Sequence, residues 1–310
     1  MSAILFGLVF ICAAIAVALP PLQDEDDVRG AFLTSRPKEK PANSGSANKP
    51  TRRRPKNTAT TSAKSTETSA KSTNKPAEKS TDTTPVKTTS GTSTKASESR
   101  PVNTPRLGLG MTLFGRDSNG LAVRVEPDRV FRNGDRVRIL LETNADGYLY
   151  IFNRTNDGAP VMIYPDAQID EGGNYLQAHV PFEIPAPDAS DERLRWFAFD
   201  ENAGTEKVIF VFTREPLKDV PIEDELVTFC GNNKCPWPVG TETWAHVQAQ
   251  MQEPLKQDRT KTYGSAQTSV EQSASTRGLG LAKDDPQPSL IMMASSTRPT
   301  LVATLDLIHK

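Results

Sequence analysis

Residues 136–154, "RVRILLETNADGYLYIFNR", contain two runs of β-forming residues separated by the turn-forming sequence "NADG". Runs of this length that are rich in β-branched and aromatic residues and bounded by Asn, Asp and Gly are typical of strands. A second Asp-Gly pair, Asp157-Gly158, follows the second run. The stretch therefore predicts two strands, 136–143 and 148–154, whose ends are set by tight turns that require Gly.

The same pattern continues on both sides of this stretch, and it predicts an all-β fold. Short β-forming runs recur every 8–15 residues with turn signals such as "RDSNG", "RNGD" and "NAGT" between them, which is typical of an antiparallel β-sandwich or small barrel of about eight strands. The run "VIFVFT" is apolar on both faces, so we expect it to be a central strand. Helical patterns follow at 222–229 and 242–252. The expected strands are 111–115, 121–127, 136–143, 148–154, 160–165, 178–184, 195–200 and 206–215.

Large apolar residues are concentrated in the middle of the chain. No aromatic residue occurs between residues 36 and 106, and Tyr263 is the only one after residue 256. We therefore expect one ordered domain between two polar flanks. The predicted organisation is a signal peptide or N-terminal membrane anchor (1–19), a disordered basic Ser/Thr/Lys/Pro-rich linker (20–106), a β-sandwich domain (107–217), a C-terminal extension with short helices (218–256) and a disordered tail (257–310).

The first 19 residues, "MSAILFGLVFICAAIAVAL", contain a continuous apolar run of 17 residues that begins at Ala3. Ala16-Val17-Ala18 fits the small-x-small pattern of a signal peptidase site, which predicts cleavage after Ala18. The run is also long enough to be an uncleaved membrane anchor, and no Lys or Arg precedes it. Both alternatives place the rest of the protein outside the cytoplasm: periplasmic, secreted or anchored.

The linker is strongly basic. Residues 36–106 contain 16 Lys or Arg and 5 Asp or Glu, so they carry a charge of +11 in a chain whose net charge is -1. The densest cluster is "TRRRPK", residues 51–56. No aromatic residues interleave for base stacking, so nucleic-acid binding is not favoured. We expect an extended soluble spacer, and the alternative role is contact with anionic polymers or lipid head groups.

The ordered part resembles a known family. The sequence from Leu107 to Arg154, followed by the blocks "MIYPDA", "HVPFEIP", "RWFAFDE" and "GTEKVIFVFTREPL", is similar to the bacterial domain of unknown function 4384. The resemblance covers residues 107–217. It implies an all-β, non-catalytic accessory or binding module that occurs behind export signals, and it brings no assigned catalytic residues.

Two cysteines outside the leader, Cys230 and Cys235, bracket the turn sequence "GNNK". In an oxidising compartment such a pair is expected to form a disulfide. The alternative is half of a zinc site, with His246 as the nearest further ligand in sequence.

Tests for chemistry give no catalytic or metal site. A calcium loop with Gly147 at its sixth position has Asn153 at the twelfth, and one with Gly158 there has Tyr164, whereas a Glu is required. No nucleophile elbow, metalloprotease helix or phosphate loop is present in the sequence. The remaining chemically relevant side chains are an acidic cluster, Asp166, Asp170 and Glu171, and three histidines, His179, His246 and His309, which are expected to be structural or surface residues.

Aromatic residues are the candidate ligand-binding side chains. Tyr148, Tyr150 and Phe152 lie on one face of a strand, while Leu149 and Ile151 lie on the other. If the aliphatic face is turned to the core, the aromatic face together with Tyr164 is available to a glycan or a protein partner. The alternative is that these aromatic side chains form a second apolar core.

The sequence thus predicts an exported, non-enzymatic binding or accessory module of the cell envelope that has no cofactor and no metal. Its partner is an unknown protein or glycan. One alternative function is a hydrolase of envelope polymers that uses acids around Asp166 to Glu171. Another is a structural protein that assembles through its edge strands.

Overall fold

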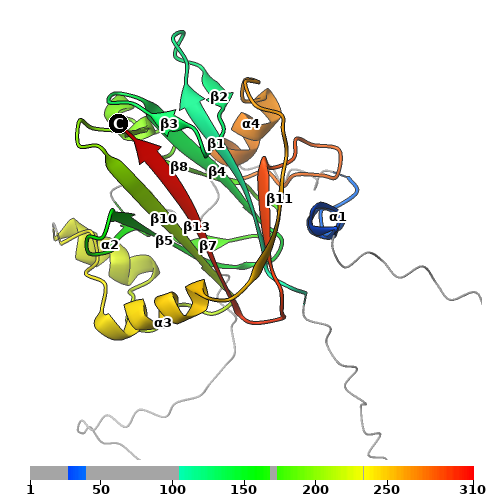
Figure 1. Ribbon diagram of the computed structural model, residues 1–310. Coiled ribbons are helices and arrows are strands. Elements are labelled where there is room, and N and C mark those ends of the chain that lie inside the picture. The colour runs from blue at the N-terminus through cyan, green and yellow to red at the C-terminus, as the bar shows by residue number, and fades with distance from the viewer. Residues whose placement is uncertain (1–26, 40–104, 168–172, 233) are drawn as a thin grey trace, which may run out of the picture. The chain divides into compact units, whose positions relative to one another are not determined.

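The computed structural model describes residues 27–39, 105–167, 173–232 and 234–310 (Figure 1). Within them, two β-sheets enclose a shared apolar core, and four α-helices lie around the sheets. Of the two predicted architectures, the sandwich-like one is observed and the barrel is not. The predicted leader, residues 1–19, and most of the predicted linker, 20–106, lie outside the described residues.

Sheet A has the strand order β11-β12-β1-β4-β8, with β2 paired to β1 and β9 paired to β4. All its pairings are antiparallel. Its strands are β1 (Gly108–Arg116), β2 (Ala122–Arg124), β4 (Arg136–Thr143), β8 (Phe182–Ile184), β9 (Phe197–Ala198), β11 (Leu255–Arg259) and β12 (Leu290–Ala294).

Sheet B has the order β3-β13-β10-β5-β6, with β7 paired to β5. Its pairings are antiparallel except that of β13 with β3, which is parallel. Its strands are β3 (Val130–Phe131), β5 (Gly147–Thr155), β6 (Val161–Tyr164), β7 (Tyr175–Leu176), β10 (Gly204–Thr213) and β13 (Thr300–His309).

Each of the eight predicted strands is present, and β10, which contains "VIFVFT", is the middle strand of sheet B as expected.

The "NADG" sequence carries the chain from β4 in sheet A to β5 in sheet B. Gly147 is required there by a close approach, because an added Cβ would lie 2.5 Å from the Thr213 carbonyl oxygen. At the other end of β5 the left-handed residue is Asn156, with φ of 49°, and not the Gly of the Asp-Gly pair.

The prediction of a disordered tail at 257–310 is wrong. This segment contains β12, β13 and most of β11, and β13 lies between β3 and β10 in sheet B (Figure 1). Its alternating sequence places Leu301, Ala303, Leu305 and Leu307 in the core between the sheets. The sandwich domain therefore extends far beyond the predicted boundary at residue 217.

The prediction of a disordered linker is wrong for residues 27–39, because they contain the helix α1 (Val28–Thr34). The Asp27 side chain accepts a hydrogen bond from the Gly30 N–H and caps this helix. Val28 and Phe32 are buried against β12 on the outer face of sheet A. The helix is too short to be stable alone, so this docking accounts for its order.

Helices also cover the outer face of sheet B. The two predicted helices are present as α2 (Glu223–Gly231) and α3 (Thr241–Met251). Val247 of α3 is fully buried against outward-facing side chains of β5 and β10. A fourth helix, α4 (Ser269–Arg277), contacts β8 of sheet A. Across the described residues, no helix has the length and apolar character needed to cross a membrane.

Candidate functional site

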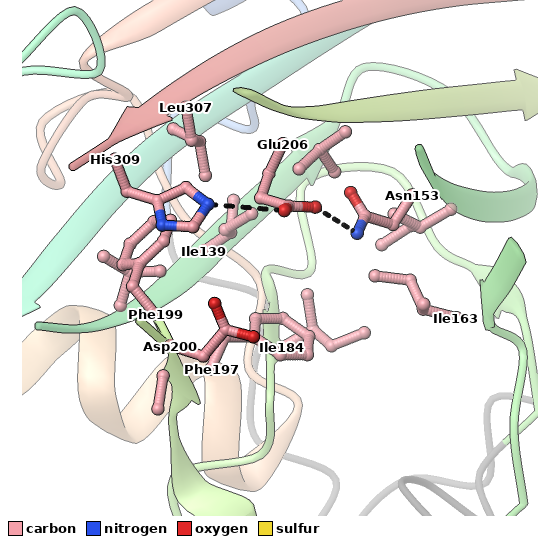
Figure 2. A pocket seen from close by; sticks show the side chains of 14 residues that line it. Ile139, Asn153, Ile163, Ile184, Phe197, Phe199, Asp200, Glu206, Leu307 and His309 are labelled. Atoms are coloured by element: carbon pink, nitrogen blue, oxygen red, sulfur yellow. Dashed lines mark hydrogen bonds and ion pairs between the residues drawn. The ribbon is translucent and has the colours of Figure 1, made fainter. Parts of the chain in front are cut away.

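A cavity of about 230 Å³ lies between the two sheets at one end of the sandwich (Figure 2). Sheet A and the segment after β9 form one wall, and sheet B forms the other. Most of the lining is apolar, and the polar side chains are Asn153, Asp200, Glu206 and His309. The apolar lining residues are Val137, Ile139, Ile151, Ile163, Ile184, Phe197, Ala198, Phe199, Val208 and Leu307.

Strand alternation explains why polar residues meet at this end. Along β10 the inward positions are Phe212, Phe210 and Val208, and the next inward position is Glu206. Along β5 the inward series that includes Ile151 ends with Asn153, and along β13 the series ends with His309. Because β5, β10 and β13 are neighbours in sheet B, the three polar side chains converge.

The Glu206 carboxylate lies between Asn153 and His309, as Figure 2 shows. The Asn153 Nδ2 group donates to Glu206 Oε2 at 2.7 Å, and the Thr155 hydroxyl donates to the same oxygen at 2.8 Å. His309 Nε2 lies 3.5 Å from Glu206 Oε1, a separation that is too long for a strong hydrogen bond. Neither His309 nitrogen has a hydrogen-bond partner among the described residues, although the side chain is 3% exposed.

Asp200 lies on the opposite side of the cavity mouth and is exposed (Figure 2). Hydrogen bonds from the Asn202 side chain and backbone hold the pKa of Asp200 below its usual value. A carboxylate with a lowered pKa stays ionised at neutral pH. The mouth therefore combines two acids with one imidazole.

The four aromatic residues predicted to form an accessible ligand surface are buried, so that prediction is wrong. Tyr148, Tyr150, Phe152 and Tyr164 are at most 2% exposed. The first three form a second apolar core under α3, which is the alternative that the sequence left open. Burial raises the pKa of the Tyr150 hydroxyl, which accepts a hydrogen bond from the Leu217 N–H. Aromatic side chains on one face of a strand can either be exposed or form a core. Here α3 covers that face, so Tyr148, Tyr150 and Phe152 form a core.

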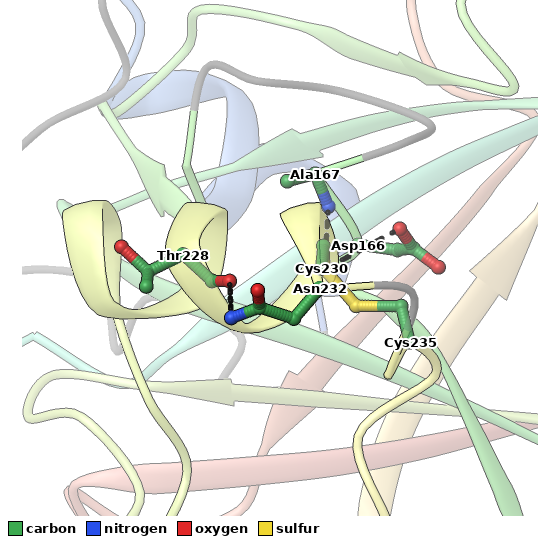
Figure 3. The surroundings of a disulfide bond; sticks show 6 residues. All are labelled: Asp166, Ala167, Thr228, Cys230, Asn232 and Cys235. Carbon is green, nitrogen blue, oxygen red and sulfur yellow. Dashed lines mark hydrogen bonds between the residues drawn. A yellow bond between two sulfur atoms is a disulfide. The ribbon is translucent and has the colours of Figure 1, made fainter.

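Cys230 and Cys235 form the predicted disulfide (Figure 3). Asp166 is buried beside it, so these three residues are the one group in the described part of the chain whose ligand atoms lie within metal-binding reach. Disulfide sulfurs are not thiolates and are poor zinc ligands. His246 is exposed on α3 and is not in this group. Asp170 and Glu171, the other predicted acids, lie outside the described residues.

A second polar cluster joins the N-terminal segment to sheet A. His179 Nδ1 lies 2.7 Å from Glu142 Oε1, and His179 Nε2 lies 2.9 Å from the Ser35 Oγ. Arg36 Nε and Nη2 donate to both Glu142 oxygens, at 2.8 and 2.6 Å. Burial alone would raise the pKa of Glu142, but hydrogen bonds from His179 and Arg36 and their charges together lower it.

The Ser35–His179–Glu142 order resembles a catalytic triad, but its surroundings do not suit one. Ser35 follows the C-terminal end of α1, and its hydroxyl donates to the Phe32 carbonyl oxygen at 2.6 Å. Carbonyl groups at a helix C-terminus disfavour the negative charge that an attacking serine and its oxyanion would develop. The arrangement is better explained as a polar clamp that holds α1 on sheet A, defined here as the exposed Ser35 and the buried Arg36, Glu142 and His179.

The cavity residues were missed by sequence reasoning because they come from distant strands. The sequence places Asn153 only in a calcium loop that lacks its Glu, predicts a structural or surface role for His309, and does not single out Glu206. One signal would have found all three, because each is the polar residue at one end of an alternating apolar series. For His309 this signal was hidden by the prediction of a disordered tail.

No curated protein and no solved structure matches the chain. Residues 130–216 match the family described as a domain of unknown function, DUF4384. The match runs from β3 to the loop after β10, so it includes Asn153, Asp200 and Glu206 but not β1, β12 or β13. It is shorter than the expected range of 107–217. This chain therefore contains a DUF4384 domain at residues 130–216, completed by strands from outside that domain.

Proposed function

We propose that this protein is an exported, non-enzymatic module of the cell envelope that binds a small, partly apolar ligand in the cavity between its sheets. The observation that carries this proposal is the cavity of about 230 Å³, with apolar walls and buried polar atoms that have no partner. Concave, mostly apolar sites with a few convergent polar groups are the usual form of small-molecule binding sites.

Buried polar groups in folded proteins nearly always have hydrogen-bond partners. His309 lacks one at both nitrogens, and Asn153 lacks one at Oδ1, within the part of the chain that the structure describes. Both residues line the same cavity. A ligand that supplies the missing partners offsets the cost of burying these groups, which is of the order of 1–3 kcal/mol each.

Export is supported by two independent features. The sequence predicts a leader at residues 1–19 with a cleavage site after Ala18. The Cys230–Cys235 disulfide is typical of oxidising compartments outside the cytoplasm.

Assembly through edge strands has less support than ligand binding. The strands at the ends of the two sheet orders, β3, β6, β8 and β11, have between two and five residues. Short edge strands are poor templates for pairing with another chain. The β11 edge also carries Asp258 and Arg259, which are paired with Arg29 and Asp128.

A blocking substitution tests the proposed function. Ile163 is half-buried and lines the cavity, so the larger ring of Ile163→Trp is expected to occupy the cavity. Ala245→Trp, on the exposed side of α3, is the matched control. Thermal unfolding with increasing 1-hexanol is expected to show saturable stabilisation of the wild type and the control, and none of Ile163→Trp. Equal responses of all three proteins would refute a cavity site.

A further inference from the structure

We infer that the ligand carries a cationic head that donates hydrogen bonds, an ammonium group on a short apolar chain or ring. This inference rests on the proposed function and specifies the chemistry of the same cavity. Its basis is that Asn153 and His309 each leave one acceptor atom without a partner at the cavity and that the carboxylates of the lining are acidic.

Asn153 contributes an acceptor. Its Nδ2 group donates to Glu206 Oε2 at 2.7 Å, and a carboxylate oxygen only accepts, so this contact fixes the orientation of the amide. The Asn153 Oδ1 atom is then the free end of the side chain, and it is buried without a partner among the described residues. A carbonyl oxygen in this position requires a donor.

His309 contributes a second acceptor. A neutral imidazole has one N–H and one acceptor nitrogen. The Glu206 carboxylate, 3.5 Å from Nε2, favours the proton on that nitrogen, which leaves Nδ1 as the acceptor. The ring is held by its contact with Phe199, whose ring centroid is 5.2 Å away, so it cannot turn to solvent without disrupting that packing.

The charge of the lining agrees with a cation. Glu206 and Asp200 are both carboxylates at the cavity, and the lining contains no Lys or Arg. Lys207, next to Glu206 in β10, points to the other face of the strand and is paired with Asp306 at 2.7 Å. An anionic head group would therefore meet two carboxylates with no cationic side chain from the lining to balance them.

The cavity volume limits the size of the apolar part. A volume of about 230 Å³ corresponds to roughly eight water-sized groups at ~30 Å³ each. A hexyl chain with an ammonium head fits this volume, whereas drug-sized ligands occupy larger pockets.

Hexylammonium, 1-hexanol and hexanoate each have six carbon atoms and differ in the polar head group. Comparing them therefore tests the cavity site and the preference for a cation separately. Their affinities for the full-length protein are measured by isothermal titration calorimetry at pH 7. Hexylammonium is expected to bind at least about tenfold more tightly than 1-hexanol, the typical effect of a hydrogen bond to a charged group. Hexanoate is expected to bind more weakly than the alcohol.

The outcomes distinguish the two claims. If 1-hexanol binds and hexylammonium binds no more tightly, the cation inference is refuted while the proposed function stands. If hexanoate is the tightest ligand, the cation inference is likewise refuted. If none of the three binds at millimolar concentration, both claims are refuted.

Charge-removing substitutions locate the cation. Glu206→Gln is expected to reduce hexylammonium affinity about tenfold and to leave 1-hexanol affinity within about twofold of wild type. Asp200→Asn, at an exposed position, makes the same comparison if Glu206→Gln does not fold. Asp306→Asn, on the other face of sheet B, is the control and is expected to change neither affinity. Unchanged hexylammonium affinity in the folded mouth variants would refute the inference.

Discussion

Replacing Glu142 with Gln is expected to destabilise the protein by about 3–5 kcal/mol, the usual cost of breaking a buried ion pair. The Glu142 side chain is 3% exposed, and that of Arg36 is 0% exposed. Arg36 Nε and Nη2 and His179 Nδ1 all point to the two Glu142 oxygens. A Gln amide removes the charge and turns a donor toward at least one of these groups.

The remaining contacts of Arg36 do not compensate for this loss. Its Nη1 and Nη2 groups also donate to the carbonyl oxygens of Ala282, Asp285 and Pro286, at 3.0 to 3.1 Å. These contacts satisfy hydrogen bonds but not the positive charge, which would be left buried in the variant. For a protein of this size, 3–5 kcal/mol corresponds to a decrease in Tm of roughly 6–20 °C.

The effect of Glu142→Gln is also expected to depend on pH. The folded-state pKa of Glu142 is lowered, so its contribution to stability is fully present above the unfolded pKa of about 4.3. This contribution is lost as the pH falls through the folded pKa. The difference in stability between wild type and variant should therefore be largest near neutral pH and shrink below about pH 4.

Urea denaturation followed by circular dichroism, at neutral and acidic pH, measures these differences. Glu215→Gln, at an exposed position, is the matched control and is expected to stay within about 0.5 kcal/mol of wild type. Hydrogen exchange of the α1 amides tests whether this helix is released first in the variant. A Glu142→Gln protein as stable as the control at neutral pH would refute the account of the clamp.

Three further perturbations test the fold. Deleting β13 (Thr300–His309) is expected to abolish cooperative unfolding, because it removes an inner strand of sheet B; a cooperative transition in the truncated protein would contradict the topology. Replacing Cys230 and Cys235 with Ser is expected to cost about 2 kcal/mol by the loop-entropy relation for so short a loop, measured as the fall in Tm relative to wild type. Phe152→Ala is expected to cost about 3–5 kcal/mol in urea denaturation, whereas exposed Leu194→Ala changes stability by at most about 0.5 kcal/mol; similar costs would place Phe152 outside a core.

The strands of the middle segment could be predicted because their signals are local. β4 and β10 combine β-branched or aromatic residues with turn sequences at their ends, and such signals do not depend on distant partners. The central position of β10 followed from apolar residues on both faces, which the two cores now explain: Phe210 lies between the sheets, and Val211 lies under α3.

The two ordered flanks could not be predicted because their stability comes from distant contacts. β13 pairs with β10 about 90 residues earlier, and its sequence contains no aromatic residue, so composition indicated a tail. For α1, order depends on Phe32 packing against β12 and on Arg36 reaching Glu142. Neither contact leaves a local signal in a polar segment.

The candidate site was hidden for the same reason. Asn153, Glu206 and His309 belong to three strands, and only the register of sheet B brings them together. Alternation along each strand predicts which side chains point inward. It does not predict that the inward apolar series of β5, β10 and β13 all end at the same edge of the core. Tyr148, Tyr150 and Phe152 instead belong to a core, because α3 covers the face on which they lie.

Methyl-detected NMR during a titration with hexylammonium tests the central claim of ligand binding between the sheets most directly. Saturable shifts are predicted for the methyl groups of Ile139, Ile184, Val208 and Leu307, which line the cavity. Val247, in the core under α3, is the internal reference and is expected to stay unchanged. Absence of saturable shifts at the cavity methyls, or equal shifts at Val247, would contradict the account.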